Sequence, residues 1–472
     1  MAGADTIERL RQFLRELAPA ARVLLIGELE RSVLRGDDVA FADVTLQEML
    51  LQELRLVVRE QRGGGPRVGS AARLFFKPLE PFLVDDRADH SHSGRVTRLA
   101  LESLWTWVRR DLLPDDGNIL AEAASEALAA GDAAKAETIN RTFQDRAAAA
   151  IEAFQETAAT DEIVSRRMLA QVGTQHPAED IATLKCALKG RDALADLAAR
   201  LPLRIGILDD RRLDECKALV DGVSARDSEL FPYALLVVMS RLSAPWQLIR
   251  FGIKAANSDI AARVVETPYG QTVTIALADL EQMVGELRND LRSGGVAVGS
   301  LLKCIHDAAR GLRTEMDLPM DSSWGRTLGS IRAQIAELLR SEINSAPGRV
   351  RRLLRARPFT EIRPNSVLDA DEVAETEALI DFVSTCRTFA NELAINEMTQ
   401  RTFSELQRYL DNGTRALLDS LHHAGALDCS FRQSQVDAAA RFCSKVFGPS
   451  YGSVLNKAAE MAAAPERKRA LA

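Results

Sequence analysis

Apolar residues recur at intervals of three and four along almost the whole chain. One such stripe is formed by Leu101, Leu104, Trp105, Val108 and Leu112. Residues at this spacing lie on one face of an α-helix, so each stripe predicts an amphipathic helix with a buried side. Trp107 lies off the stripe and is expected to be partly exposed or covered by residues 62–93. The pattern predicts an all-α protein, with a multi-helix body of packed antiparallel helices plus a C-terminal helical bundle.

Other stretches extend this prediction. Helices are expected over residues 133–157, 179–200, 211–224, 229–256, 275–291, 297–313, 326–343, 371–394, 399–421 and 452–464. The longest apolar run, Phe231–Met239, is far shorter than the ~20 residues of a membrane span and predicts a buried helix. One strand pair is a candidate, Val264-Val265 with Thr272–Thr274, although a loop between two helices fits equally well.

Start signals accompany the stripes of the C-terminal bundle. Asp369 with Glu372, and Ser430 with Gln433, have the spacing of a capping box, in which a short polar side chain accepts a hydrogen bond from a free N–H group of the first turn. The stripe that follows the second signal consists of Val436, Ala439, Ala440 and Cys443.

Two stretches with glycine and proline divide the chain. The first contains Gly63-Gly64-Gly65-Pro66 and an apolar cluster around Phe75 and Phe82, which predicts a segment packed on the body. The second begins at Ala346-Pro347-Gly348, where we expect a helix to end. The predicted divisions are N-terminal helices over 1–61, a connecting segment over 62–94, a main helical body over 95–345, an Arg-rich linker over 346–368 and the helical bundle over 369–472.

Composition narrows the class of protein. The 472 residues are 46% apolar and only 5% aromatic, which favours cores of leucine, alanine and valine between helices. A net charge of −7 argues against extensive nucleic-acid binding. Arginine far outnumbers lysine, a usage typical of GC-rich bacterial genomes.

The cysteines indicate the compartment. All six stand singly in helical contexts without a CxxC motif, which favours buried thiols over disulfides. The N-terminus lacks the pattern of a signal peptide, and no transmembrane segment is predicted. We expect a cytoplasmic, soluble protein.

Catalytic motifs are not evident. The glycine-rich stretches 63–70 and 294–300 lack the lysine of a phosphate-binding loop, and no HExxH or GxSxG pattern occurs. Cys304 and His306 lie two residues apart on a predicted helix, so they face different directions. No catalytic residue and no cofactor is predicted.

The strongest local signal is a concentration of arginines at the predicted linker. It comprises Arg349, Arg351, Arg352, Arg355, Arg357 and Arg363. Guanidinium groups suit phosphate and carboxylate, so this Arg-rich segment is a candidate surface for an anionic partner. A run of acids from Asp369 to Glu377 follows directly, and mutual neutralisation of two solvated faces explains the same pattern. An anionic membrane surface is a third reading.

A second candidate is a metal site in a polar stretch. His90 and His92 alternate there, beside Asp86 and Asp89. Imidazole and carboxylate groups together suit zinc or a similar transition metal. A solvated loop is the competing interpretation, because no matching ligand set occurs elsewhere.

These observations leave three functional hypotheses. The leading one is a non-enzymatic bacterial interaction or scaffold protein that binds a protein or anionic partner, in a groove between helices or on the Arg-rich segment. The alternative is an all-α enzyme whose site is assembled from distant helices, with a metal at His90 and His92. Nucleic-acid binding through Arg349–Arg363 is the third and is disfavoured by the acidic total. The oligomeric state is left open.

Overall fold

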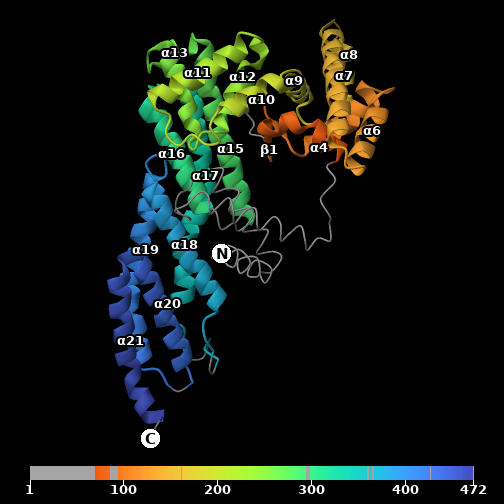
Figure 1. Cartoon of the computed structure of the whole chain (residues 1–472). Helices are drawn as coiled ribbons and strands as arrows, with labels where there is room; N and C mark the ends of the chain where they lie inside the picture. Colours follow the sequence, from red (N-terminus) through yellow and green to blue (C-terminus); the bar gives the residue numbers. More distant parts are fainter. Residues whose placement is uncertain are drawn as a thin grey trace, which may run out of the picture. The chain divides into compact units, whose positions relative to one another are not determined.

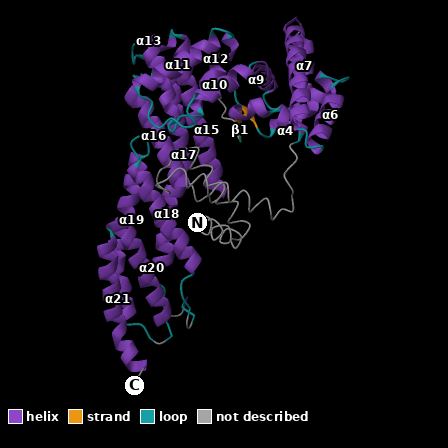
Figure 2. Ribbon diagram, viewed as in Figure 1, coloured by secondary structure: helices purple, strands orange, loops and turns teal. Residues whose placement is uncertain are grey.

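Helices form most of the described part of the chain in the computed structural model (Figures 1 and 2). The structure describes residues 70–85, 94–160, 162–293, 298–358, 361–363, 366–425 and 427–470. The predicted all-α fold class is confirmed. No helix within these ranges is long and apolar enough to cross a membrane. The chain divides into two compact units, unit 1 with Met1–Glu286 and Gly311–Gly325, and unit 2 with Leu287–Arg310 and Arg326–Ala472.

Within the described ranges, the helices of unit 1 are mostly short. Its elements are α4 (Ala71–Phe75), η1 (Lys77–Phe82), β1 (Leu83–Val84), β2 (Val96–Thr97), α5 (Ala100–Trp107), the π-helix η2 (Val108–Leu112), α6 (Gly117–Ala129), α7 (Ala133–Thr160), α8 (Glu162–Val172), α9 (Pro177–Lys189), α10 (Arg191–Arg200), α11 (Asp210–Ser224), η3 (Ser228–Leu230), α12 (Phe231–Met239), η4 (Pro245–Leu248), α13 (Ile249–Ala256), α14 (Ala261–Val265) and η5 (Pro268–Gly270). The two short strands pair in parallel, with Leu83 opposite Val96.

Three longer helices contribute residues to both units, and four belong to unit 2 alone. The former are α15 (Gln271–Ser293), α16 (Val298–Glu315) and α17 (Ser323–Leu354). The latter are α18 (Ala370–Thr388), α19 (Asn396–His422), α20 (Cys429–Phe447) and α21 (Pro449–Ala470).

The core of unit 1 is built around aromatic side chains and the apolar helix α12. Phe75 packs on Phe143 of α7 with ring centroids 4.7 Å apart, and Phe82 meets Tyr233 of α12 edge-on at 5.3 Å. Every described side chain of α12 except Pro232 is buried. The apolar run Phe231–Met239 is thus a buried helix, as predicted.

Several predicted helices of unit 1 are interrupted. The stretch 179–200 forms two helices with Gly190 between them, where an added Cβ would lie 2.5 Å from Leu230 and 2.8 Å from the Cys186 carbonyl oxygen. The stretch 229–256 breaks after Met239 and resumes at η4, which begins with Pro245. The candidate strand pair is helical, in α14 and α15. Close packing and proline thus override the continuous periodicity.

Of the two tryptophans of α5, Trp107 is buried more deeply than Trp105, the one predicted to be in the core. Trp107 is only 1% exposed and packs edge-on against Phe154 of α7, whereas Trp105 is half-buried. The prediction assumed one buried face, but α7 contacts both tryptophans, Trp107 through Phe154 and Trp105 through Phe143. Trp105 still contacts the core, through Phe75 and Phe143.

Unit 2 contains one long helix that passes through a proline. α17 continues to Leu354, although a break was predicted at Pro347. An interior proline costs ~3 kcal/mol or more. The buried side chains beyond it, Val350, Leu353 and Leu354, each gain ~1.5–3 kcal/mol on burial, which outweighs that cost. The apolar stripe therefore decides where the helix ends.

Helices α18 to α21 form the bundle of unit 2 with the C-terminal part of α17 (Figure 1). The predicted stripe on α20 is buried, and it packs with Leu406, Leu410, Leu417 and Leu421 of α19. Asp369 caps α18 by accepting a hydrogen bond from the Asp371 N–H at 2.9 Å, as predicted. Ser430 is instead inside α20, whose N-cap is Asp428.

Candidate functional site

The Arg-rich segment is neutralised by carboxylates of unit 2. Arg349 forms an ion pair with Glu375 of α18 at 3.3 Å, and Arg352 forms one with Glu372. The remaining pairs are Arg351 with Glu405 of α19 and Arg355 with Glu361 at 3.1 Å. Arg357 lies over the Phe431 ring at 5.1 Å, and Arg363 is exposed. The acids that follow the segment in sequence therefore supply two of the four partners.

The backbone of this segment is also fixed to α20. The Gln435 side-chain amide donates hydrogen bonds to the carbonyl oxygens of Leu353 and Arg355, both at 3.0 Å. Arg432 donates to the Arg357 carbonyl oxygen at 3.0 Å and pairs with Asp428. The Leu353 carbonyl is one of the groups that the end of α17 leaves without a helical partner, and the other two bonds fix the residues that follow the helix. Binding of an anion here stays a prediction, and the anion has to compete with four carboxylates.

The predicted metal ligands Asp86, Asp89, His90 and His92 lie outside the described residues. Within the described ranges, no group of three or more His, Cys, Asp or Glu side chains is placed to hold a metal ion. His306 is within hydrogen-bond distance of Asp307, with Nδ1 and Oδ1 2.9 Å apart, and its ring lies 4.7 Å from that of Phe389. All six cysteines are free thiols.

A groove of about 410 Å³ lies beside the connection between α10 and α11 in unit 1. Its apolar lining consists of Leu201, Pro202, Ile205, Cys216 and Leu219, and its charged lining of Arg200, Asp209, Arg211, Arg212 and Glu215. Arg211 pairs with Glu215 at 3.0 Å, and the Asp209 carboxylate accepts a hydrogen bond from the Arg212 N–H at 2.8 Å. Among the described residues, the Arg212 guanidinium has no ion pair.

The connection along this groove is held rigidly although it is not helical. The Ile205 N–H donates to the Arg241 carbonyl at 2.7 Å, and the Ser243 N–H donates to the Ile205 carbonyl at 2.9 Å. Leu208 is held at both backbone groups, by the Gln247 side chain at 3.2 Å and by Arg250 at 2.8 Å.

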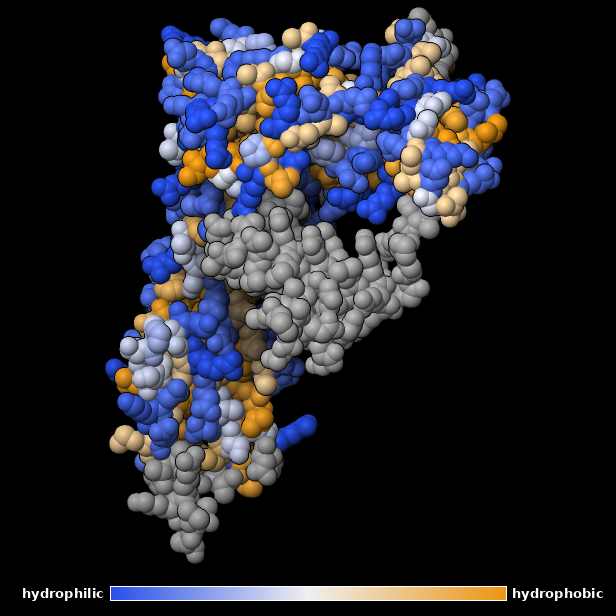
Figure 3. Space-filling model, in the orientation of Figure 1, coloured by the Kyte–Doolittle hydropathy of each residue, from blue (hydrophilic) through white to orange (hydrophobic). Residues whose placement is uncertain are grey.

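Two large apolar side chains project from this rigid connection. Leu203 is 81% exposed and Ile207 is 74% exposed, whereas Leu201, Ile205 and Leu208 are buried. Single exposed apolar residues are common, and small hydrophobic patches lie between hydrophilic residues on the face drawn in Figure 3. Leu203 and Ile207, however, are two exposed apolar residues on one fixed loop beside a groove with an apolar lining, which is a more specific indication of a binding surface.

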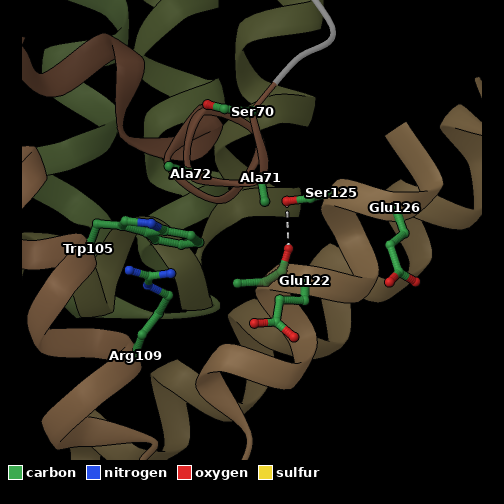
Figure 4. A pocket seen from close by; sticks show the side chains of 9 residues that line it. Ser70, Ala71, Ala72, Trp105, Arg109, Glu122, Ser125 and Glu126 are labelled. Atoms are coloured by element: carbon green, nitrogen blue, oxygen red, sulfur yellow. Dashed lines mark hydrogen bonds between the residues drawn. The ribbon is translucent and has the colours of Figure 1, made fainter. Parts of the chain in front are cut away.

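A second cavity, of about 380 Å³, lies between α4, α5 with η2, and α6 (Figure 4). The Arg109 guanidinium lies over the Trp105 ring at 5.1 Å, and Glu122 and Glu126 of α6 line the cavity too. The Ser125 hydroxyl on the same helix donates to the Ala121 carbonyl at 2.8 Å (Figure 4). The cavity thus contains one cation, two carboxylates and an indole.

Sequence reasoning missed both the groove and the cavity. The arginines and acids that line them are spread over short helices and look like ordinary solvated faces. Leu203 and Ile207 carried a usable signal, because both are large and apolar in a stretch that follows Pro202 and contains Gly206. That signal indicates a loop with exposed apolar side chains, but it does not show that the loop is rigid.

Comparisons with known proteins add no functional information. No family model, no curated protein and no solved structure matches this chain.

Proposed function

We propose that the chain is a non-enzymatic interaction protein that docks a segment of another protein in the groove between α10 and α11. The observation that carries this proposal is the rigid connection that holds Leu203 and Ile207 in solvent. A fixed loop loses little conformational entropy on binding, so burial of its apolar side chains contributes to affinity with a small ordering cost.

The chemistry of the groove specifies the partner segment. Apolar lining residues fit a leucine or isoleucine side chain, and Leu203 and Ile207 extend that apolar contact. Arg212 has no ion pair within the described ranges and is free to receive a carboxylate. The partner is therefore a protein with an acidic segment that also carries a large aliphatic side chain.

The cellular compartment and the role of the Arg-rich segment belong to the same proposal. Six free thiols fit a reducing compartment such as the bacterial cytoplasm. The Arg-rich segment has a smaller part, because its ion pairs leave few free guanidinium groups for nucleic acid or membrane.

The test compares capture by four forms of the full chain. Leu203→Asp/Ile207→Asp removes the exposed contacts, and Leu99→Asp/Ile119→Asp is a matched control at positions 85% and 65% exposed. Arg212→Glu tests the charge. Each aliphatic contact is worth ~1.5 kcal/mol or more, so the first variant should bind roughly a hundredfold more weakly. A photo-reactive residue at position 203 should crosslink to the same partner.

Two results contradict the proposal. Retention of the same proteins by the wild-type chain and by the Leu203/Ile207 variant excludes this loop as a docking surface. A change from dimer to monomer in that variant, measured by light scattering, identifies the occupant as a second copy of this chain rather than another protein.

A further inference from the structure

The cavity at Trp105 contains charges that folding leaves unpaired. Within the described ranges, the Arg109 guanidinium has no hydrogen bond and no ion pair, and its Nε atom is buried without a partner. Glu122 and Glu126, which are exposed, also make no ion pair there, although they line the same cavity. A partly buried cation usually finds a carboxylate, so the unpaired Arg109 calls for an explanation.

The Trp105 ring orients the unpaired guanidinium. Arg109 lies against the indole face with its carbon 5.1 Å from the ring centroid (Figure 4). A cation–π contact uses the charge of the guanidinium and not its N–H donors, so it leaves these donors without an acceptor. The terminal Nη donors are therefore available to an anionic group inside the cavity, whereas Nε is buried.

The opposite wall carries two like charges on one helix face. Glu122 and Glu126 are four residues apart on α6, a spacing at which like charges weaken a helix. A cation bound between them would remove that repulsion. The side of the cavity formed by Glu122 and Glu126 thus suits an ammonium group, whereas the side with Arg109 suits an anion.

The backbone fixes the separation of the two walls. α6 begins at Gly117, where an added Cβ would lie 2.7 Å from the Arg109 Cα and 2.9 Å from the Arg109 carbonyl oxygen. The two backbones therefore touch directly at a position where only glycine fits. Arg109 itself is in the π-helix η2, a rare geometry that is enriched at functional sites.

We propose that this cavity binds a small zwitterion, with its anionic oxygens on Arg109, its ammonium group at Glu122 and Glu126, and its apolar part against Trp105. The volume of about 380 Å³ is within the range of small-molecule sites. This inference does not depend on the groove between α10 and α11, which is lined by other residues.

A series of probes that differ in charge separation tests the proposal. Glycine, β-alanine, 4-aminobutyrate and 6-aminohexanoate are titrated into the full chain by calorimetry, with hexanoate and hexylamine as singly charged controls. One chain length should bind roughly ten- to a hundredfold more tightly than either control, as expected for charge-assisted hydrogen bonds at both ends. An aminoalkyl phosphonate of that length then distinguishes a phosphate-type ligand from a carboxylate.

Variants assign the two walls. Arg109→Gln should lose binding of the best probe roughly tenfold or more, while the neighbouring Arg110→Gln, which removes an exposed arginine paired with Asp111, should bind as the wild type does. Glu122→Gln/Glu126→Gln, at exposed positions that tolerate change, should abolish the preference for the zwitterion over hexanoate. Equal binding of zwitterion and controls, or wild-type affinity in Arg109→Gln with an unchanged melting temperature, would overturn the proposal.

Discussion

Gln435 is predicted to hold the end of α17 in place, and the substitution Gln435→Leu tests it. The side chain is fully buried and donates to the carbonyl oxygens of Leu353 and Arg355. Leucine has a similar volume and donates nothing, so it removes both hydrogen bonds without leaving a large cavity.

The size of the destabilisation expected for Gln435→Leu follows from how deeply each hydrogen-bonding group is buried. The Leu353 carbonyl is buried, and loss of its donor costs ~1–3 kcal/mol, whereas water can reach the partly buried Arg355 carbonyl. The Gln435 Oε1 atom is itself buried without a partner, so its removal offsets part of the loss. We expect a net destabilisation of about 1–2 kcal/mol, which makes local opening of the 353–357 segment roughly tenfold more frequent.

Limited proteolysis of the full chain measures how often the 353–357 segment opens. Trypsin cleaves after Arg355, and under conditions in which opening is fast relative to cleavage the rate follows the open population. Gln433→Leu is the control, because Gln433 lies on the same helix and its side chain bonds Asp437 across one turn instead of the 353–357 segment. Equal cleavage rates in the two variants would refute the idea that Gln435 fixes the segment.

Two further predictions concern packing and thiol chemistry. Gly311→Ala should destabilise unit 1 by ~1–3 kcal/mol, because an added Cβ would lie 2.5 Å from the Trp246 indole. Gly285→Ala, where an added Cβ has no atom within 4 Å, should instead stabilise the chain by ~0.5–1 kcal/mol. The urea midpoints of unfolding measure both changes, and equal shifts in the two variants would contradict the steric argument. Burial raises the pKa of Cys386 and of Cys443 to about 12, so at pH 8 only ~1 of these thiols in 10⁴ is ionised. Iodoacetamide should therefore modify both cysteines far more slowly in the native chain than in urea, and the rate in the native chain should rise with pH.

The fold class was predictable because burial follows periodicity. Stripes such as Val436, Ala439, Ala440 and Cys443 are buried in the structure, and the apolar run of α12 is a core helix. Element ends were harder to predict, because they depend on contacts between distant residues. Pro347 is accommodated since the stripe continues beyond it, while α9 ends at Gly190, where Leu230 leaves no room for a side chain.

Candidate sites were less predictable than elements for a related reason. The sequence drew attention to six arginines within fifteen residues, but it could not show that four of them pair with Glu361, Glu372, Glu375 and Glu405. The cavity at Trp105 combines residues from three elements, and only their packing brings Arg109 near Glu122 and Glu126. Its one sequence signal, Trp105 and Arg109 four residues apart on one helix face, is common in proteins.

The contrast between these two sets of arginines shows how the structure ranks candidate surfaces. In the Arg-rich segment four guanidinium groups have carboxylate partners, and exposed pairs of this kind contribute ~0–1 kcal/mol each, so an anion gains little by displacing them. At Trp105 a single guanidinium is held on an indole, opposite carboxylates that it does not reach. A ligand that joins these charges displaces no existing ion pair, so its binding free energy does not include the cost of breaking one. Unpaired charge at a defined cavity is for this reason a stronger indication of binding than the number of arginines.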